Sequence, residues 1–297
     1  MTVRTESVWL QAGAAKLYGV IERPPVPAAG LAVLVLPGSG PVDRDGNFPG
    51  SHNNSLKMLA AGLVSQGIAC LRIDKRGIGA SHLAGRDEAT LRLDTYAADA
   101  AAWLSFLRGQ PDISAVALIG HSEGALIASL TAQASPVAAL VLLAGAGRPA
   151  GQLVRDQLAA AFLPSGLLAD AERIFDALEA GQTLMSVPPE LAALCRPSVQ
   201  PYLMSWMARD PAQELAAVTT PVLIVHGDRD LQVGEVDARA LATAQPRARL
   251  EIIAGMNHLL KTVSSDQADN LASYNDQARP LAPELVPLLA GFLRKVS

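Results

Sequence analysis

Short β-rich runs that alternate with longer helical patterns constrain this fold more than any other feature of the sequence. The run LAVLVL is apolar throughout, as is typical of a strand that is buried on both faces of a sheet. Alternation of this kind predicts an α/β fold with a mostly parallel central sheet flanked by helices. The expected core strands are Leu31–Leu36, Ile68–Ile73, Ala115–Gly120, Val137–Leu143, Pro221–Gly227 and Leu250–Ile253.

The remaining elements follow from apolar periodicity and from turn and capping residues. Two opening runs, Glu6–Leu10 and Leu17–Glu22, predict an N-terminal hairpin joined at Gly13. Asn53 or Asn54 is placed to cap the first long helix. The expected helices are Ser55–Gln66, Thr90–Arg108, Ala125–Ser135, Asp237–Ala244 and Pro283–Lys295.

Between Gly147 and Ala217 the pattern changes to helices with no convincing strand, broken by several prolines. This change predicts an inserted helical subdomain at residues 147–217. The α/β core would then comprise residues 1–146 and 218–297. A length of 297 residues is compatible with one large domain that carries such an insertion.

Composition excludes several classes of protein. Half of the residues are hydrophobic and 18% are charged, which favours a globular chain with a large core. With a net charge of −4 and no Lys/Arg run, we expect no nucleic-acid partner. We find no signal-peptide pattern and no stretch long enough to span a bilayer, so we expect a soluble, cytoplasmic protein. Cys70 and Cys195 are expected to be small buried hydrophobes, and the oligomeric state stays open.

The chemistry is concentrated in the motif GHSEG, residues Gly120 to Gly124. Its two glycines allow a strand to turn sharply into a helix and to expose a serine hydroxyl. An expected buried strand precedes the motif and an expected helix follows it, which is the context that the motif requires. We therefore expect Ser122 to be a nucleophile, and the alternative is an ordinary serine in a tight turn. A serine needs a base and an acid to become reactive.

The base is expected to be His258, because it alone among the five histidines follows the last core strands. His121 adjoins the serine and is expected to shape the turn, whereas His226 is expected to pack at the end of its strand. His52 and His82 have no assigned role, although His52 follows a glycine-rich loop that should border the site.

The acid should lie between the GHSEG motif and His258 in the sequence, near the end of a strand. The candidates are Asp228, Asp230, Glu235 and Asp237. We favour Asp230, the last carboxylate of the turn GDRD, and Asp228 is its rival with turn stabilisation as its ordinary role. Such an acid would hold the imidazole in the correct tautomer and stabilise the imidazolium.

Attack on an ester carbonyl places negative charge on oxygen, which backbone N–H groups can stabilise. One donor is expected to be the N–H of Glu123, directly after the nucleophile. The other should come from the loop Pro37–Pro41, where Ser39 is the candidate and Gly40 the alternative. The glycines of this loop would let bare backbone approach the substrate.

Taken together, the chain resembles the α/β-hydrolases, and within them bacterial carboxylesterases related to the serine aminopeptidase-like hydrolases. The matching motifs are PGSGPVDRDGN at Pro37–Asn47, DKRGIGAS at Asp74–Ser81, GHSEG at the elbow, HGDRD around Asp230 and GMNH ending at His258. The resemblance implies an α/β-hydrolase fold with a helical cap inserted after the sixth core strand. It also implies a Ser122, Asp230, His258 triad and neither a metal nor an organic cofactor.

The resemblance carries two further implications. Asp74, Arg76 and Gly77 would stabilise a loop near the site without taking part in the chemistry. The segment Arg196–Leu203 resembles cap sequence, and its contribution to specificity stays open.

The leading hypothesis is a carboxylesterase that cleaves small-molecule esters of short to medium acyl chains through an acyl-enzyme. A thioesterase, a small peptidase or an acyltransferase could use the same three residues. An alternative of another class is a non-catalytic ligand-binding protein on the same scaffold, against which a complete triad counts.

Overall fold

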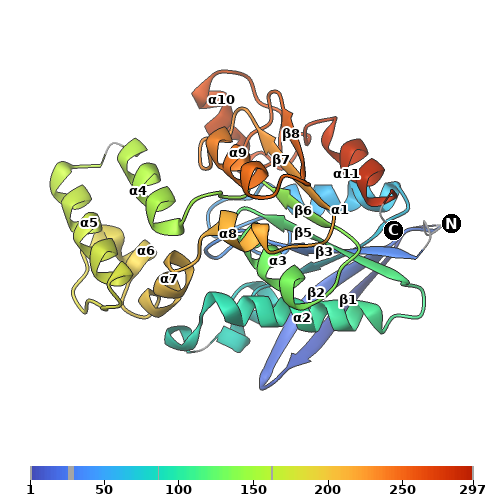
Figure 1. The fold of residues 1–297 in the computed structure, drawn as a ribbon, viewed down its shortest axis with the longest axis horizontal. Helices are drawn as coiled ribbons and strands as arrows, with labels where there is room; N and C mark the ends of the chain where they lie inside the picture. Colours follow the sequence, from blue (N-terminus) through green and yellow to red (C-terminus); the bar gives the residue numbers. More distant parts are fainter. Residues whose placement is uncertain (1, 26–29, 86, 162, 296–297) are drawn as a thin grey trace.

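A single eight-stranded sheet runs through the molecule, with helices on both of its faces (Figure 1). The structure is a computed structural model that describes residues 2–25, 30–85, 87–161 and 163–295. The strand order is β1-β2-β4-β3-β5-β6-β7-β8. Pairing is antiparallel for β1 with β2 and for β2 with β4, and it is parallel for the others. The expected mostly parallel sheet flanked by helices is confirmed.

The strands agree with the sequence prediction except at their ends. The bounds are β1 Arg4–Ala12, β2 Ala15–Arg23, β3 Leu31–Leu36, β4 Ala69–Ile73, β5 Ala115–His121, β6 Leu140–Leu143, β7 Val222–Gly227 and β8 Arg249–Ile253. The hairpin is longer than expected and turns at Gly13, whose φ of 61° suits the first position of a tight hairpin turn. β6 starts three residues later than expected, because the chain bends at Ala138, although the Ala138 N–H already donates to the Val116 carbonyl oxygen of β5 at 2.8 Å.

The core helices are also close to their expected ranges. They are α1 Ser55–Ser65, α2 Leu93–Arg108, α3 Glu123–Ala134, α9 Glu235–Ala244 and α11 Leu285–Leu293. Two further helices, α8 Pro211–Ala216 and α10 Gln267–Ala272, have no range of their own in the sequence prediction. α2 begins at Leu93 and not at Thr90, because Leu91 is extended and the Leu93 N–H donates to the Ser205 hydroxyl at 2.9 Å. Short 3-10 segments, Gly79–Gly85, Glu88–Thr90 and Ser273–Asn275, were not expected.

The capping of α1 agrees only in part with the sequence prediction. Asn54 occupies the cap position in a left-handed conformation, with φ of 56°, but its side chain makes no capping hydrogen bond. The Asn53 side chain instead accepts from the Ser55 N–H at 2.9 Å. The carbonyl oxygen of Asp45 accepts from the next N–H group, that of Leu56 at 3.2 Å. A distant backbone segment therefore takes part in closing the helix.

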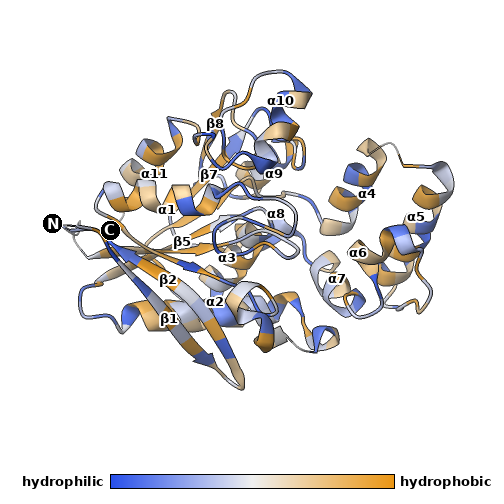
Figure 2. Cartoon of the chain, turned by 180° about the vertical axis from the view of Figure 1, so that it is seen from behind, coloured by the Kyte–Doolittle hydropathy of each residue, from blue (hydrophilic) through white to orange (hydrophobic). Residues whose placement is uncertain are grey.

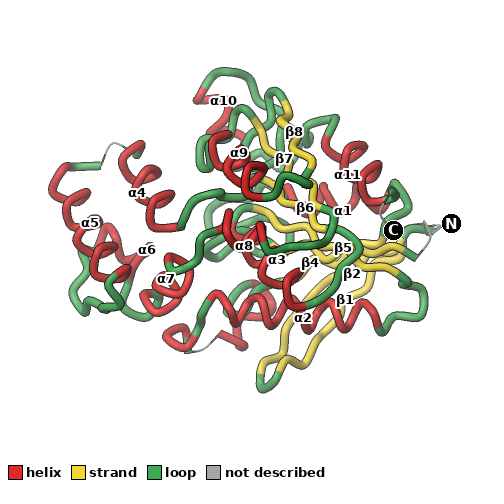
Figure 3. The backbone as a smooth tube through the Cα atoms, in the orientation of Figure 1, coloured by secondary structure: helices red, strands yellow, loops and turns green. Residues whose placement is uncertain are grey.

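The two faces of the sheet carry separate apolar cores, because side chains alternate along each strand. On one face, side chains such as Leu34 and Leu118 pack with α2 and α3. On the other, side chains such as Val33 and Ile119 pack with α1 and α11. Figure 3 shows the strands enclosed between helices, and Figure 2 shows the hydrophobic strands at the centre. This two-sided burial explains the uniformly apolar strand sequences.

Between β6 and β7 the chain forms a helical insert that projects from one end of the sheet (Figure 1). Its helices are α4 Ala150–Ala160, α5 Ser165–Glu179, α6 Ala192–Cys195 and α7 Gln200–Met207, with a 3-10 turn at Pro189–Leu191. We call these four helices the insert. α8 follows them but contacts α3 and α9, on the face of the sheet. The division into a core and a cap at residues 147–217 stays a prediction.

The cysteines occupy the positions that the sequence suggested: Cys70 and Cys195 are both buried free thiols. In the part of the chain that the structure describes, no helix is long and apolar enough to cross a membrane.

Candidate active site

Ser122 occupies a sharp turn between β5 and α3. β5 ends at His121 and α3 begins at Glu123, so the serine is the one residue between them. Its backbone has φ of 55° and ψ of −121°, a combination that residues with side chains rarely adopt. Strain of this kind persists only where the surrounding structure enforces it, and it is concentrated at functional sites. The strand–turn–helix context that the GHSEG motif requires is present.

Three glycines make room for this turn. A Cβ on Gly120 would lie 2.1 Å from the Gly124 carbonyl oxygen, and a Cβ on Gly124 would lie 2.4 Å from the Leu36 carbonyl oxygen. Both distances are too short for any side chain. A Cβ on Gly38 would lie 3.1 Å from the Cβ of Ser122. The loop after β3 therefore passes directly beside the serine.

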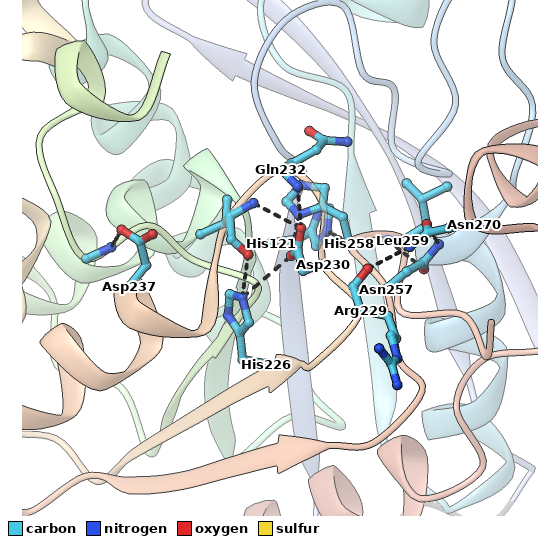
Figure 4. A network of polar contacts seen from close by, with 12 residues as sticks. His121, His226, Arg229, Asp230, Gln232, Asp237, Asn257, His258, Leu259 and Asn270 are labelled. Atoms are coloured by element: carbon cyan, nitrogen blue, oxygen red, sulfur yellow. Dashed lines mark hydrogen bonds and ion pairs between the residues drawn. The ribbon is translucent and has the colours of Figure 1, made fainter. Parts of the chain in front are cut away.

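His258 lies in the loop after β8 and is held by Asp230, in the turn after β7 (Figure 4). Its Nδ1 lies 2.7 Å from Oδ2 of Asp230. A carboxylate can only accept a hydrogen bond, so Nδ1 is the donor and the proton sits on that nitrogen. Nε2 is then unprotonated in the neutral ring and can accept a proton. This is the tautomer that a general base needs.

The surroundings of Asp230 favour its ionised form. Its side chain is 1% exposed, and Oδ1 accepts from the N–H groups of Gln232 at 2.8 Å and Val233 at 3.0 Å. Burial by itself raises the pKa of this carboxyl group, but the charge and hydrogen bond of His258 outweigh it. The pKa therefore lies below its ordinary value.

Asp228 has a different environment. Its Oδ1 accepts from the Gly255 N–H at 2.7 Å and lies 3.7 Å from Nε of Arg229. The residue is exposed, so this carboxylate joins the turn after β7 to the turn after β8. Of the two rivals named from the sequence, it is Asp230 that the structure brings to His258.

Two further histidines support the same region. His121 is buried, and its Nε2 lies 2.7 Å from the carbonyl oxygen of His258, with ring centroids 4.9 Å apart. Burial, together with the charge of His258, lowers the pKa of His121 to about 4. His226 is also buried, and its Nε2 lies 2.8 Å from the Val233 carbonyl oxygen and 3.6 Å from Oδ2 of Asp230. Both rings pack against the polar network drawn in Figure 4.

Ser122 lines two cavities. The larger, of about 530 Å³, extends beneath the insert, and the smaller, of about 260 Å³, is bordered by His258. Four residues line both of them: Ser39, Pro41, Ser122 and Gln232. The larger cavity has an apolar wall from α3, α4 and α7 made of Leu126, Leu153, Val154, Leu203 and Trp206, with Val199 at the start of α7.

The two expected oxyanion donors flank the serine. Glu123 is the first residue of α3, and Ser39 belongs to the loop that passes beside Ser122. Ser39 lines both cavities, whereas Gly40, with φ of 68°, lines only the larger one among the residues described. The roles of these N–H groups stay predictions.

One pair of charges was not anticipated from the sequence. Lys75 and Glu123 form an ion pair of 3.2 Å whose side chains are 5% and 1% exposed, and both line the larger cavity. Lys75 belongs to the motif DKRGIGAS, but only its neighbours were given a role there. The signal available in the sequence is a lysine two residues after an expected buried strand, since a charge at such a position needs a partner.

The neighbours of Lys75 have structural partners, as the resemblance implies. Asp74 is fully buried and accepts from the backbone N–H of Arg44 and of Ala80, each at 2.9 Å. Arg76 makes two hydrogen bonds to Asp99, at 2.6 and 2.7 Å. These contacts hold the loop that follows β4.

The other candidates from the sequence are not assembled with the site. His52 and His82 are exposed and are absent from the described lining of both cavities. The Nδ1 of His82 contacts the Gly79 carbonyl oxygen at 3.1 Å. Within the described ranges, no group of three or more His, Cys, Asp or Glu side chains is arranged to hold a metal ion.

Comparison with known proteins identifies the family to which the chain is similar. Residues 49–262 match the family model described as serine aminopeptidase, S33. Esterase EstD from Thermotoga maritima is 32% identical over 234 residues, which are 77% of this chain and 54% of that protein. The chain thus spans about half the length of this curated relative.

Solved structures share the fold at low sequence identity. Est1E from Butyrivibrio proteoclasticus, determined with ferulic acid bound, has a TM-score of 0.64 and 18% identity over 97% of this chain and 96% of its own. The α/β hydrolase GrgF from Penicillium sp. sh18 has a TM-score of 0.65 and 19% identity over 100% and 99% of the two chains. These likenesses show the α/β-hydrolase fold.

Proposed function

This chain belongs to the serine aminopeptidase S33 family of α/β-hydrolases, and from that premise we propose that it hydrolyses carboxylic esters through an acyl-enzyme on Ser122. The observation that carries the proposal is the 2.7 Å contact of His258 with buried Asp230, beside a cavity that Ser122 also lines. The similarity to an enzyme named as an esterase supports the same reaction.

In the proposed reaction, His258 first accepts a proton and then returns it in each of the two steps. Nε2 of His258 accepts the hydroxyl proton as Ser122 Oγ attacks the ester carbonyl carbon. The N–H groups of Glu123 and Ser39 stabilise the oxyanion, and Asp230 stabilises the imidazolium. Collapse of the tetrahedral intermediate breaks the ester C–O bond, and His258 returns the proton to the leaving alkoxide. Water then repeats the sequence on the acyl-enzyme and releases the acid.

The two cavities suggest how the substrate lies. The leaving alkoxide must be within reach of His258, and that residue borders the 260 Å³ cavity, so we assign the alcohol portion there. The acyl portion then occupies the 530 Å³ cavity beneath the insert, which is in the size range of small-molecule sites. Its apolar wall suits a short to medium hydrocarbon chain.

The charges around the larger cavity favour an uncharged acyl group. Each acidic residue in its described lining has its charge offset by a cation, Glu123 by Lys75 and Glu88 by Arg196, although Oε2 of Glu123 has no hydrogen-bond partner among the residues described. An aminopeptidase needs an available carboxylate to hold the ammonium group of its substrate. We therefore favour an ester substrate over a peptide with a free amino terminus.

Labelling with a fluorophosphonate tests the nucleophile. The protein should incorporate one label per chain, at Ser122, and Ser122→Ala should incorporate none and lose nearly all p-nitrophenyl ester turnover. His258→Ala should lose turnover to a similar extent, because the residues act as a unit. Retention of native turnover by a folded Ser122→Ala variant would refute the proposal, and absence of both labelling and turnover in the native protein would favour a non-catalytic scaffold.

A rate panel tests the substrate class. We expect kcat/KM to be highest for p-nitrophenyl esters of short to medium acyl chains, lower for acyl-CoA thioesters and lowest for amino-acid amides. A thioesterase or a peptidase would reverse one of these rankings while retaining the same nucleophile.

A further inference from the structure

The ammonium group of Lys75 has three partners near the turn that carries Ser122. Its Nζ donates to the Gly38 carbonyl oxygen at 2.5 Å and to Oε1 of Glu123 at 3.2 Å. It also lies 5.3 Å from the centre of the Tyr96 ring, on whose face a cation is attracted. The lysine is 5% exposed, so it connects three segments of the chain with little access to water.

The contact with Gly38 has a geometric consequence for the next residue. In a trans peptide the carbonyl oxygen and the following N–H point in opposite directions. When Lys75 holds the Gly38 oxygen, the Ser39 N–H points away from the lysine. Gly38 lies against Ser122, since a Cβ there would be 3.1 Å from the serine Cβ. The orientation of one peptide plane beside the nucleophile is thus tied to one ammonium group.

The contact with Glu123 ties the same ammonium group to the other side of the site. Glu123 directly follows the serine and begins α3, and its backbone N–H is the other expected oxyanion donor. Its carboxylate is 1% exposed, so its orientation is restricted by the ion pair and by packing. Lys75 therefore contacts Gly38, which precedes one expected donor, and Glu123, which carries the other.

We propose that Lys75 is a positioning residue for the oxyanion hole, which it aligns by holding the Gly38 carbonyl oxygen while Glu123 anchors its ammonium group. This inference rests on the proposed esterase function. It assigns to the buried ion pair a part in transition-state stabilisation, in addition to any contribution to the fold. Donors that are misaligned lose most of their effect on the developing charge, because the benefit depends on preorganised geometry.

Lys75→Met is the direct test, because methionine retains an apolar stem but cannot donate a hydrogen bond. We expect kcat for a p-nitrophenyl ester to fall about 10- to 100-fold with KM changed less than about threefold. This loss is smaller than the roughly 10²- to 10³-fold loss expected when a whole donor is removed. The inhibition constant of a trifluoromethyl ketone, which forms an oxyanion on the serine, should rise by the same factor as kcat/KM falls. Arg23→Met is the matched control. Arg23 is the last residue of β2, and it is likewise a buried cation, paired with Glu6 and Asp112.

A double variant separates positioning from stability. Lys75→Met alone leaves the Glu123 carboxylate buried without its partner, which destabilises the fold. Lys75→Met with Glu123→Gln removes that unpaired charge and should recover much of the thermal stability. If Lys75 aligns the Gly38 peptide, kcat and ketone affinity should stay low in the double variant. Glu123→Gln alone keeps an oxygen acceptor for Lys75 and should lose less kcat than Lys75→Met.

Three results would overturn the inference. The first is a folded Lys75→Met variant whose kcat lies within threefold of the native value. The second is recovery of kcat together with stability in the double variant, which would make the pair purely structural. The third is a loss of kcat in Arg23→Met equal to that in Lys75→Met. Native protein that is neither labelled at Ser122 nor active would instead overturn the esterase proposal and this inference with it.

Discussion

At the scale of single residues, the candidate site combines backbone strain at Ser122 with close packing around His258 and Asp230. Ser122 is held in an unfavourable backbone conformation by glycines that no other residue could replace without overlap. His258 is buried between its carboxylate partner and the ring of His121. A residue in this setting has little freedom to rearrange, which favours a preorganised site.

The two rival carboxylates should differ sharply when each is changed to an amide. Asp230→Asn would place an amide against Nδ1 of His258 and favour the wrong tautomer, so kcat should fall by about 10³- to 10⁴-fold. Asp228→Asn would alter exposed contacts, to the Gly255 N–H and to Arg229, and should cost less than about threefold. Steady-state kinetics on both variants checks this, and the opposite ranking would transfer the acid role to Asp228.

His121 should make the protein less stable in mild acid. Its pKa is about 4 in the folded protein against an ordinary value of 6.5. Between these values the unfolded chain binds a proton that the folded protein does not. The free energy of unfolding should therefore fall as the pH is lowered, by about 2 kcal/mol between pH 7 and pH 5.

Urea denaturation at the two pH values measures this effect. His121→Gln should show a smaller loss, whereas His52→Gln, which changes an exposed loop histidine, should retain the native loss. Equal losses in the native protein and in His121→Gln would show that another group is responsible.

How far the sequence predicted these residues depends on the range of the signal. Ser122 follows from a local motif, and His258 and Asp230 follow from chain order and from turns at strand ends, so all could be named in advance. The pairing of Lys75 with Glu123 joins residues 48 positions apart, and no local pattern encodes it. The bond from His121 to the His258 backbone is of the same long-range kind.

At the scale of elements, the insert is fastened to the core at its beginning and near its end. Asp237 of α9 is fully buried and accepts from the Gly147 N–H and from the side chain of Arg148, just before α4. Near the end of α7, the Ser205 hydroxyl accepts from the N–H of Leu93 at the start of α2. The cavity beneath the insert is thus bounded by helices with defined attachments to the core.

The insert should set the acyl-chain preference if the larger cavity holds the acyl group. Val199→Trp adds bulk at the start of α7, on the cavity wall. We expect kcat/KM for a hexanoyl ester to fall about tenfold relative to an acetyl ester. Met185→Trp, at a position that is 84% exposed, should leave this ratio unchanged. A native ratio in Val199→Trp would place the acyl group elsewhere.

Element boundaries were less predictable than element types. The apolar runs identified the core strands because both faces of the sheet are covered. The sequence predicts the start of α2 too early. The observed start depends on the hydrogen bond that the Leu93 N–H donates to the Ser205 hydroxyl in α7 of the insert. The prolines of residues 147–217 indicated helix ends but could not show that α8 packs on the core.

At the scale of the whole molecule, the active-site candidates converge because β5, β7 and β8 are all parallel. Residues that follow parallel strands meet at one edge of the sheet, as the sequence order alone suggests. The order of the strands across the sheet does not follow from the sequence in this way, because it depends on the crossover connections and not on local sequence. For example, β3 lies between β4 and β5 although it precedes both of them in the chain.

If the proposed acyl-enzyme forms, the two cavities around Ser122 would affect which molecule completes the reaction. After the first alcohol leaves, the acyl group would still fill the larger cavity while the smaller one stands open beside His258. Any small nucleophile that fits there competes with water for the acyl-enzyme. Added butanol should therefore yield butyl ester alongside free acid. Product analysis by chromatography checks this, and free acid alone at high butanol would refute it. Partitioning between hydrolysis and transesterification would then depend on which nucleophiles fit into the smaller cavity, of about 260 Å³.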